Sequence, residues 1–320
     1  MKIGIVSPSA GYMMKFPRRV DRGIKWLRSR GVEPVFGIHA FENRSYYSSN
    51  AENRVEDIHS FLDCDVDIIM ASIGGYISVH LLPLLDYNKI SKAGKTFCGY
   101  SDISAILLAL ATRSGAKCVY GPTFLAEICE YPKPYDDTIK YLNLILHGKD
   151  ICYTQPAMTV KEFIPWENEE TGICRMKEMK LNTSWEVLRR GKAHGPIWGG
   201  NLQTLLLIIG TDYFPLSTLY NAIFFFEDIE ENPAIIDAML YSLYLRGVFD
   251  TISGLIVGRF KTNTLSNHVF QLLSKLVKKA DIPILCNVDI GHVQPMLSIP
   301  LGAYTILDTE NDIRWECYAH

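Results

Sequence analysis

Short apolar runs alternate with longer amphipathic segments along the first half of the chain. Apolar runs bounded by Gly, Pro or Ser indicate buried strands, whereas apolar residues at every third or fourth position indicate helices. The pattern predicts strands at 3–6, 34–38, 66–71 and 96–98, and helices at 19–27, 50–61, 77–85 and 103–110. Because strands that alternate with helices form parallel sheets covered on both faces, we expect residues 1–150 to form a parallel α/β domain of the Rossmann or flavodoxin type.

Residues 151–190 break this alternation. They mix Thr, Glu, Lys and aromatic residues without a helical period, so we interpret them as irregular strands and a crossover between two domains. A chain of 320 residues is long enough for two domains, and we place the second at 191–320. Its strands are expected at 222–226, 252–257, 284–286 and 303–307, and its helices at 202–209, 233–246 and 267–279.

The composition is that of a globular protein, with 48% hydrophobic and 21% charged residues. A formal net charge of −3 gives no basic field, so nucleic acid polymers and anionic membranes are poor partners. None of the eight cysteines forms a C-x-x-C pair, which favours reduced structural thiols. The chain starts on a strand pattern, with no charged leader and no apolar run long enough to span a bilayer. We therefore expect a cytoplasmic protein.

The segment Gly99-Tyr100-Ser101-Asp102 carries the most informative local signal. It joins the run 96–98 to the helical pattern 103–110 and places Ser101 at the apex of a strand–turn–helix elbow. Such an elbow exposes the serine hydroxyl above the sheet and directs the N–H of the next residue, Asp102, towards an oxyanion. The fifth position is Ile103, where a G-x-S-x-G elbow has glycine, so a plain turn before a helix is the alternative.

Gly74-Gly75 follows the strand expected at 66–71 and also has two interpretations. It makes a tight turn, or it brings a backbone N–H close to an oxyanion. Ligand sites in parallel sheets lie beyond the carboxyl ends of the strands, where both this pair and Ser101 fall. The chain has no G-x-x-x-x-G-K-[ST] loop, no G-x-G-x-x-G fingerprint and no metal-ligand spacing, so nucleotide-phosphate, dinucleotide and metal chemistry lack their main signals.

A serine nucleophile requires a base and an orienting carboxylate, for which His292 and Glu227 are the candidates. His292 lies in a turn-rich loop after the strand expected at 284–286, and an ordinary turn histidine is the alternative. Glu227 directly follows the apolar run 222–226. Its alternative is a solvated acidic start to the next helix, where the helix dipole favours anions, together with Asp228, Glu230 and Glu231.

Five short motifs, taken in chain order, resemble the LD-carboxypeptidase family of serine peptidases. They are Ile73-Gly74-Gly75-Tyr76 with Leu82-Pro83, Gly99-Tyr100-Ser101-Asp102, Gly199-Gly200-Asn201-Leu202, Phe226-Glu227-Asp228 and Gly291-His292. Within the family the chain looks more like the microcin C self-immunity branch, because of Tyr120-Gly121-Pro122, Trp185-Glu186-Val187-Leu188 and Gly191-Lys192-Ala193. The resemblance covers nearly the whole chain.

The resemblance implies a Ser-Glu-His triad in that chain order. Ser101 would be the nucleophile, His292 the general base and acid, and Glu227 the group that orients His292. The backbone N–H groups of Gly75 and Asp102 would form the oxyanion hole. The implied α/β fold has a parallel-sheet N-terminal domain that carries the nucleophile and a smaller, β-rich C-terminal domain that carries Glu227 and His292. The resemblance also implies a homodimer that works without a metal or other cofactor.

The self-immunity branch implies that the substrate is an aminoacyl-nucleotide or microcin C-like compound, cleaved at an amide. The alternative is a murein tetrapeptide, cleaved by an LD-carboxypeptidase of cell-wall recycling. Trp185 and Trp166 lie where the branch stacks a base, although both also suit packing between domains. Asn201 is a substrate contact by resemblance and the N-cap of the helix at 202–209 by position.

Two other functional classes remain open. A cytosolic esterase would use the same triad on a different substrate. A non-catalytic, two-lobed binding protein would leave the joint occurrence of Ser101, Glu227 and His292 without a reason.

Overall fold

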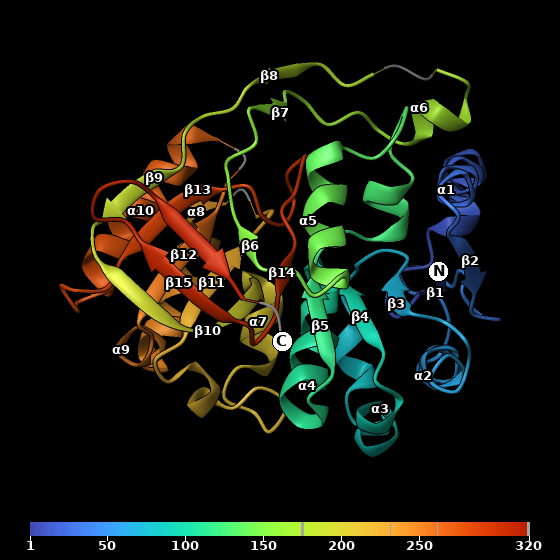
Figure 1. The fold of residues 1–320 in the computed structure, drawn as a ribbon, viewed down its shortest axis with the longest axis horizontal. Coiled ribbons are helices and arrows are strands. Elements are labelled where there is room, and N and C mark those ends of the chain that lie inside the picture. The colour runs from blue at the N-terminus through green and yellow to red at the C-terminus, as the bar shows by residue number, and fades with distance from the viewer. Residues whose placement is uncertain (174–175, 231, 261, 319–320) are drawn as a thin grey trace.

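The computed structural model describes residues 1–173, 176–230, 232–260 and 262–318, and these residues form two large sheets flanked by helices (Figure 1). Glu231, considered above as part of an acidic helix start, lies outside the described residues. The first sheet has the strand order β14-β5-β4-β3-β1-β2. All its neighbouring strands are parallel except β14, which the C-terminal part of the chain adds antiparallel to β5. The bounds are β1 (Lys2–Val6), β2 (Glu33–Phe36), β3 (Ile68–Ala71), β4 (Thr96–Gly99), β5 (Lys117–Tyr120) and β14 (Ile299–Pro300).

Helices cover both faces of the first sheet, as expected for alternating strands and helices (Figure 1). One face packs against α1 (Pro17–Ser29), the short π-helix Phe124–Ile128 and α5 (Asp136–Leu146), which share one apolar core. The other face packs against α2 (Ala51–Ser60), α3 (Tyr87–Ala93) and α4 (Ser104–Ser114), whose core continues into the second half of the chain.

In the described residues the second sheet has the order β6-β16-β15-β10-β11-β12-β13-β9. The four strands β10 to β13 are parallel, and the outer strands are antiparallel to their neighbours. The bounds are β6 (Ile151–Cys152), β9 (Glu186–Arg189), β10 (Lys192–Asn201), β11 (Ile223–Glu227), β12 (Gly254–Gly258), β13 (Ile284–Val288), β15 (Tyr304–Asp308) and β16 (Arg314–Cys317). The helices are α7 (Leu202–Ile208), α8 (Pro233–Leu245), α9 (Val248–Thr251) and α10 (Asn263–Leu276). The predicted α/β fold class is confirmed.

The crossover segment enters this second sheet at both edges, through β6 and β9. Between them it forms a two-stranded sheet of β7 (Met158–Val160) and β8 (Met179–Leu181), and the short helix α6 (Glu167–Glu170). Figure 1 shows this part of the chain passing over the top of the molecule towards α1.

One local prediction was wrong, and one long strand was not predicted. The helix predicted at 77–85 is a 3-10 turn, Ser78–Leu81, followed by α3, because Pro83 has no N–H to continue a helix and disfavours the helical backbone before it. The strand β10 was not predicted, since four of its ten residues are glycine or proline, which are depleted in strands. Gly199 is required there by packing: a Cβ would lie 1.8 Å from the carbonyl oxygen of Phe225.

Helix α4 lies between the two sheets. All its residues from Ser104 to Leu110 are buried, and it contacts β5 of the first sheet as well as α7 and β10. A helix that is apolar all round is buried all round, so α4 is held at the domain interface. Despite this apolar character, neither α4 nor any other described helix has the length and hydropathy needed to cross a membrane.

A buried charge network attaches the crossover segment to the first domain. The Arg19 guanidinium is fully buried and pairs with Glu130 at 3.0 Å and with Glu169 of α6 at 2.5 Å. Lys177 pairs with the same Glu130 oxygen at 2.8 Å and donates to Gln294 at 2.6 Å. Gln294 lies two residues after His292, so the network reaches the loop that carries the candidate base.

Candidate active site

The backbone at Ser101 forms the strained elbow that the sequence predicts. Strand β4 ends at Gly99, and one 3-10 turn leads into α4. Ser101 has a φ of 61°. This left-handed conformation costs a non-glycine residue about 1–3 kcal/mol. A Cβ on Gly99 would lie 2.8 Å from Cγ2 of Ile103, so the sharp turn needs glycine at this position.

The Gly74-Gly75 loop after β3 faces this elbow. A Cβ on Gly74 would lie 3.0 Å from the Cβ of Ser101 and 3.5 Å from the backbone nitrogen of Asp102. The Gly74 carbonyl accepts a hydrogen bond from the N–H of Ala10 at 3.1 Å. Because the C=O and N–H of a trans peptide point in opposite directions, the N–H of Gly75 points away from Ala10.

The buried side chain of Asp102 holds these loops together. Its Oδ2 accepts hydrogen bonds from the Ser9 hydroxyl at 2.6 Å and from the Ser78 N–H at 2.9 Å. The Ser78 hydroxyl donates to the Asp102 carbonyl at 2.6 Å. The loops after β1, β3 and β4, which are neighbours in the sheet, therefore form one hydrogen-bonded unit around Ser101.

His292 connects Ser101 to Glu227. Its Nε2 lies 3.1 Å from the Ser101 hydroxyl, and its Nδ1 lies 2.8 Å from Oε2 of Glu227. The backbone N–H of His292 donates to the same carboxylate oxygen at 3.2 Å. The preceding residue, Gly291, has a φ of 74°, and a Cβ there would lie 2.0 Å from Cδ of Glu227, so only glycine permits this approach.

Glu227 is the last residue of β11 and is only 1% exposed. The burial excludes the solvated helix start considered as an alternative for this residue. Its second oxygen, Oε1, accepts hydrogen bonds from the Tyr120 hydroxyl at 2.6 Å and from Nδ2 of Asn201 at 3.3 Å. Gly258 of the next strand leaves room for this side chain, since a Cβ there would lie 2.4 Å from the Cβ of Glu227.

His292 and Glu227 each shift the pKa of the other towards its charged form. Burial alone would lower the pKa of His292, but the Glu227 charge and hydrogen bond outweigh it and raise that pKa above its ordinary value. Burial alone would raise the pKa of Glu227, but the charge of His292 and the hydrogen bonds from His292 and Tyr120 lower it. The pair therefore favours an ionised carboxylate beside the imidazole.

Asp289 anchors the His292 loop, and Trp185 belongs to this anchor. The fully buried Asp289 carboxylate accepts hydrogen bonds from Nε1 of Trp185 at 2.8 Å and Nδ2 of Asn182 at 2.9 Å, and it pairs with Arg259 at 3.1 Å. Trp185 is 7% exposed. These contacts suit the packing interpretation of Trp185, and its contact with a substrate stays a prediction.

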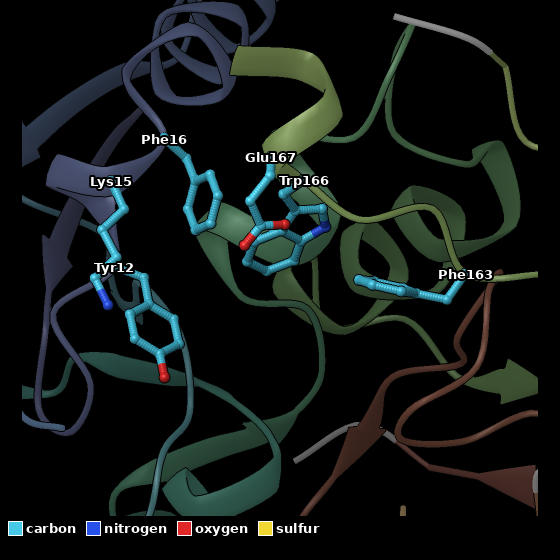
Figure 2. Close-up of a pocket in the computed structure, with 6 residues that line it drawn as sticks. All are labelled: Tyr12, Lys15, Phe16, Phe163, Trp166 and Glu167. Atoms are coloured by element: carbon cyan, nitrogen blue, oxygen red, sulfur yellow. The ribbon is translucent and has the colours of Figure 1, made fainter. Parts of the chain in front are cut away.

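Trp166 lies at a pocket of about 310 Å³ between the first domain and the crossover segment (Figure 2). The Trp166 ring meets Phe16 edge-on, with ring centres 5.3 Å apart, and the Arg19 guanidinium lies 4.6 Å from its centre. Figure 2 shows aromatic rings around the pocket, together with the Lys15 ammonium and the Glu167 carboxyl group. The lining residues are Tyr12, Lys15, Phe16, Phe163, Trp166 and Glu167.

Asn201 is the N-cap of α7, as its position predicts, and its Oδ1 accepts a hydrogen bond from the N–H of Thr204 at 3.1 Å. Its amide nitrogen reaches Glu227, so the side chain is occupied at both ends. The sequence interpretation missed Tyr120 and Asp289 as members of this site. Tyr120 ends a strand in the Tyr-Gly-Pro segment and Asp289 opens the His292 loop, and neither signal identifies a partner.

Comparisons with known proteins agree along most of the chain. The family model described as the LD-carboxypeptidase N-terminal domain matches residues 3–121, and that of the LD-carboxypeptidase C-terminal domain matches residues 194–307. The chain is 32% identical over 316 residues to the microcin C7 self-immunity protein MccF of Escherichia coli, which covers 97% of this chain and 91% of that protein. It is 26% identical over 313 residues to a probable murein peptide carboxypeptidase of Bacillus subtilis, covering 96% and 88%.

A solved structure of MccF in complex with glutamyl sulfamoyl guanosine has the same fold. It superimposes with a TM-score of 0.91 at 29% identity and covers 100% of this chain and 96% of that one.

Replacing Glu227 tests its electrostatic coupling to His292. Glu227→Gln keeps the size of the side chain and removes the charge that raises the pKa of His292, while burial continues to lower it. An NMR titration of the imidazole C–H resonances should therefore place the His292 pKa above its ordinary value in the wild type and below it in the variant.

The matched control is Asp237→Asn, which removes the partner of the surface histidine His268. This change should leave the titration of His292 unaltered. A His292 pKa that is equal in wild type and Glu227→Gln would contradict the coupling.

Proposed function

The chain belongs to the LD-carboxypeptidase family of serine peptidases, and on that basis we propose that it hydrolyses an amide bond with Ser101, His292 and Glu227 as its triad. One observation carries the proposal: a continuous hydrogen-bonded series runs from the Ser101 hydroxyl through both ring nitrogens of His292 to Glu227. Nucleophile, base and orienting carboxylate are the three groups that serine hydrolysis requires.

In the proposed reaction, the Ser101 hydroxyl attacks the substrate carbonyl while Nε2 of His292 takes its proton. The imidazolium, stabilised by Glu227, then gives that proton to the leaving amine, and water hydrolyses the acyl-enzyme by the same steps in reverse. The base must be neutral to accept the proton, so kcat/KM should rise with pH through the pKa of His292.

The oxyanion of the tetrahedral intermediate is proposed to bind the N–H groups of Gly75 and Asp102. The Gly74 carbonyl is held by Ala10 on the far side of the peptide, and this orientation directs the Gly75 N–H to the side opposite Ala10. The Asp102 N–H follows Ser101 in the elbow, which is the usual position of an oxyanion donor. Two preformed donors need no rearrangement when the negative charge develops.

We favour an aminoacyl-nucleotide or microcin C-like compound as the substrate. The Trp166 pocket offers aromatic faces for a base, and Lys15 and Glu167 add one charge of each sign at its lining. The match to MccF, which is described as a microcin C7 self-immunity protein and was solved with glutamyl sulfamoyl guanosine, supports this class. Asn201 donates a hydrogen bond to Glu227, and Trp185 donates one to Asp289 at the base of the His292 loop. We propose that both residues affect substrate binding by holding these groups in place.

A murein tetrapeptide is the second candidate substrate, because a relative of 26% identity is described as a probable murein peptide carboxypeptidase. Measuring the hydrolysis rates of three compounds distinguishes the two candidates. The compounds are an aminoacyl sulfamoyl adenosine, a processed microcin analogue and a murein tetrapeptide.

We also propose a cytoplasmic homodimer. The described cysteines, Cys64, Cys98, Cys118, Cys129, Cys152, Cys286 and Cys317, are free thiols, which suits a reducing compartment. Tyr241 and Leu245 lie one turn apart on α8 and are 48% and 80% exposed, an apolar surface that a second copy would cover. Sedimentation velocity at micromolar concentration should give twice the mass of the chain, and the mass of one chain would contradict the dimer.

Ser101→Ala should leave the fold intact and lower kcat by roughly 10³-fold or more, as loss of a triad nucleophile does. The measurement is steady-state hydrolysis of the aminoacyl sulfamoyl adenosine, with thermal unfolding to verify the fold. The control is Ser114→Ala, which replaces the serine at the C-terminal end of α4 and should retain full activity. Near-normal turnover by folded Ser101→Ala would refute the assignment.

Trp166→Ala should weaken binding of an aminoacyl sulfamoyl adenosine by roughly 1–3 kcal/mol, the energy of stacking one base on an aromatic ring. Hydrolysis of a murein tetrapeptide should change little, since it has no base to stack. Trp185→Ala is the comparison variant. Because Trp185 is buried, its loss should lower the melting temperature and weaken hydrolysis of both substrates equally. Equal losses on both substrates in Trp166→Ala would exclude base stacking there and favour the murein substrate.

A further inference from the structure

Tyr120 is a buried tyrosine whose backbone pairs with β4, the strand that leads into the Ser101 elbow. It ends β5, where it lies opposite Gly99 of β4 on one side and Ile299 of β14 on the other. The side chain is fully buried. Its position therefore follows that of the Ser101 elbow, which begins directly after Gly99.

The side chain of Tyr120 crosses from the first sheet to the second. Its ring packs against Phe225 of β11, with ring centres 5.2 Å apart, and a Cβ on Gly200 would lie 3.6 Å from its Cε2. The hydroxyl then donates a 2.6 Å hydrogen bond to Oε1 of Glu227. Tyr120 thus joins the domain of the nucleophile directly to the carboxylate of the other domain.

The two oxygens of Glu227 have separate partners. Oε2 accepts both hydrogen bonds from His292, and Oε1 accepts those from Tyr120 and Asn201. The Tyr120 bond is the shortest of the four. A carboxylate held at both oxygens cannot rotate about its terminal bond, so the direction in which Oε2 meets the imidazole is set by the donors on Oε1.

The electrostatics keep Tyr120 a donor. Burial, together with the adjacent Glu227 charge, raises the pKa of Tyr120 well above its ordinary value, so the phenol stays protonated. A neutral O–H donor stabilises the carboxylate without neutralising it, and the negative charge remains available to the imidazolium.

We propose that Tyr120 is a positioning residue of the Ser101, His292 and Glu227 triad, which orients Glu227 from the domain that carries the nucleophile. The inference rests on the proposed function. A purely structural role, in which the hydroxyl only satisfies a buried carboxylate, would affect stability and leave turnover and the His292 hydrogen bond unchanged.

The test is Tyr120→Phe, which removes one oxygen atom. We expect kcat to fall roughly 10- to 100-fold, the effect of losing one hydrogen bond to a charged group, with KM unchanged. In the free protein, the low-field proton resonance of the His292 Nδ1–H bound to Glu227 should shift, because the carboxylate is no longer held.

Tyr153→Phe is the matched control. Tyr153 is also buried, and its hydroxyl donates a 2.7 Å hydrogen bond to the carbonyl of Ser298, away from Glu227. It should lose comparable thermal stability while kcat and the His292 resonance remain those of the wild type. A Tyr120→Phe variant with the kcat of the wild type and an unshifted His292 Nδ1–H resonance would overturn the inference.

Failure of the proposed function is distinguishable from failure of this inference. Activity that survives Ser101→Ala would remove the triad, whereas the resonance of the free protein reports on Tyr120 without any substrate. Should Tyr120→Phe not fold, wild-type protein labelled at the tyrosine Cζ serves instead. The Tyr120 resonance should then move as His292 is protonated, and a resonance that stays fixed would overturn the proposal.

Discussion

The site depends on a buried carboxylate that both domains must satisfy. Moving an isolated carboxylate out of water costs several kcal/mol, so Glu227 is stable at 1% exposure only with its hydrogen bonds in place. Two come from His292, one from Tyr120 of the first sheet and one from Asn201. Because these donors come from different sheets, satisfying Glu227 also fixes the distance between the Ser101 elbow and the His292 loop.

Space around the carboxylate matters as much as its hydrogen bonds. Gly258 and Gly291 both approach Glu227 so closely that a Cβ at either would overlap it. The elbow makes a similar demand at Gly99, and the fully buried helix α4 holds the elbow against the second sheet. The glycines near the site therefore serve packing between strands and loops as well as turn formation.

The His292 loop is also supported from the crossover segment. Trp185 and Asn182 of that segment donate hydrogen bonds to Asp289. Lys177 of the same segment donates to Gln294 and also pairs with Glu130, the carboxylate that Arg19 binds. The aromatic pocket at Trp166 is built by the same segment and by the residues just before α1. The pocket lining and the side chains that hold the His292 loop therefore come in part from the same segment of the chain.

The sequence by itself determined half of the described strands, most of the longer helices, the strained elbow at Ser101, the carboxylate at the end of β11 and the histidine loop. These follow from local periodicity and turn chemistry, and the order of short motifs indicated the family. Only the tertiary structure decided that Glu227 is buried against Tyr120, that Trp185 holds Asp289 and that β14 returns to the first sheet. Each of these contacts joins residues about one hundred or more positions apart, and a local pattern of apolar and polar residues carries no information on which distant strand edges will meet.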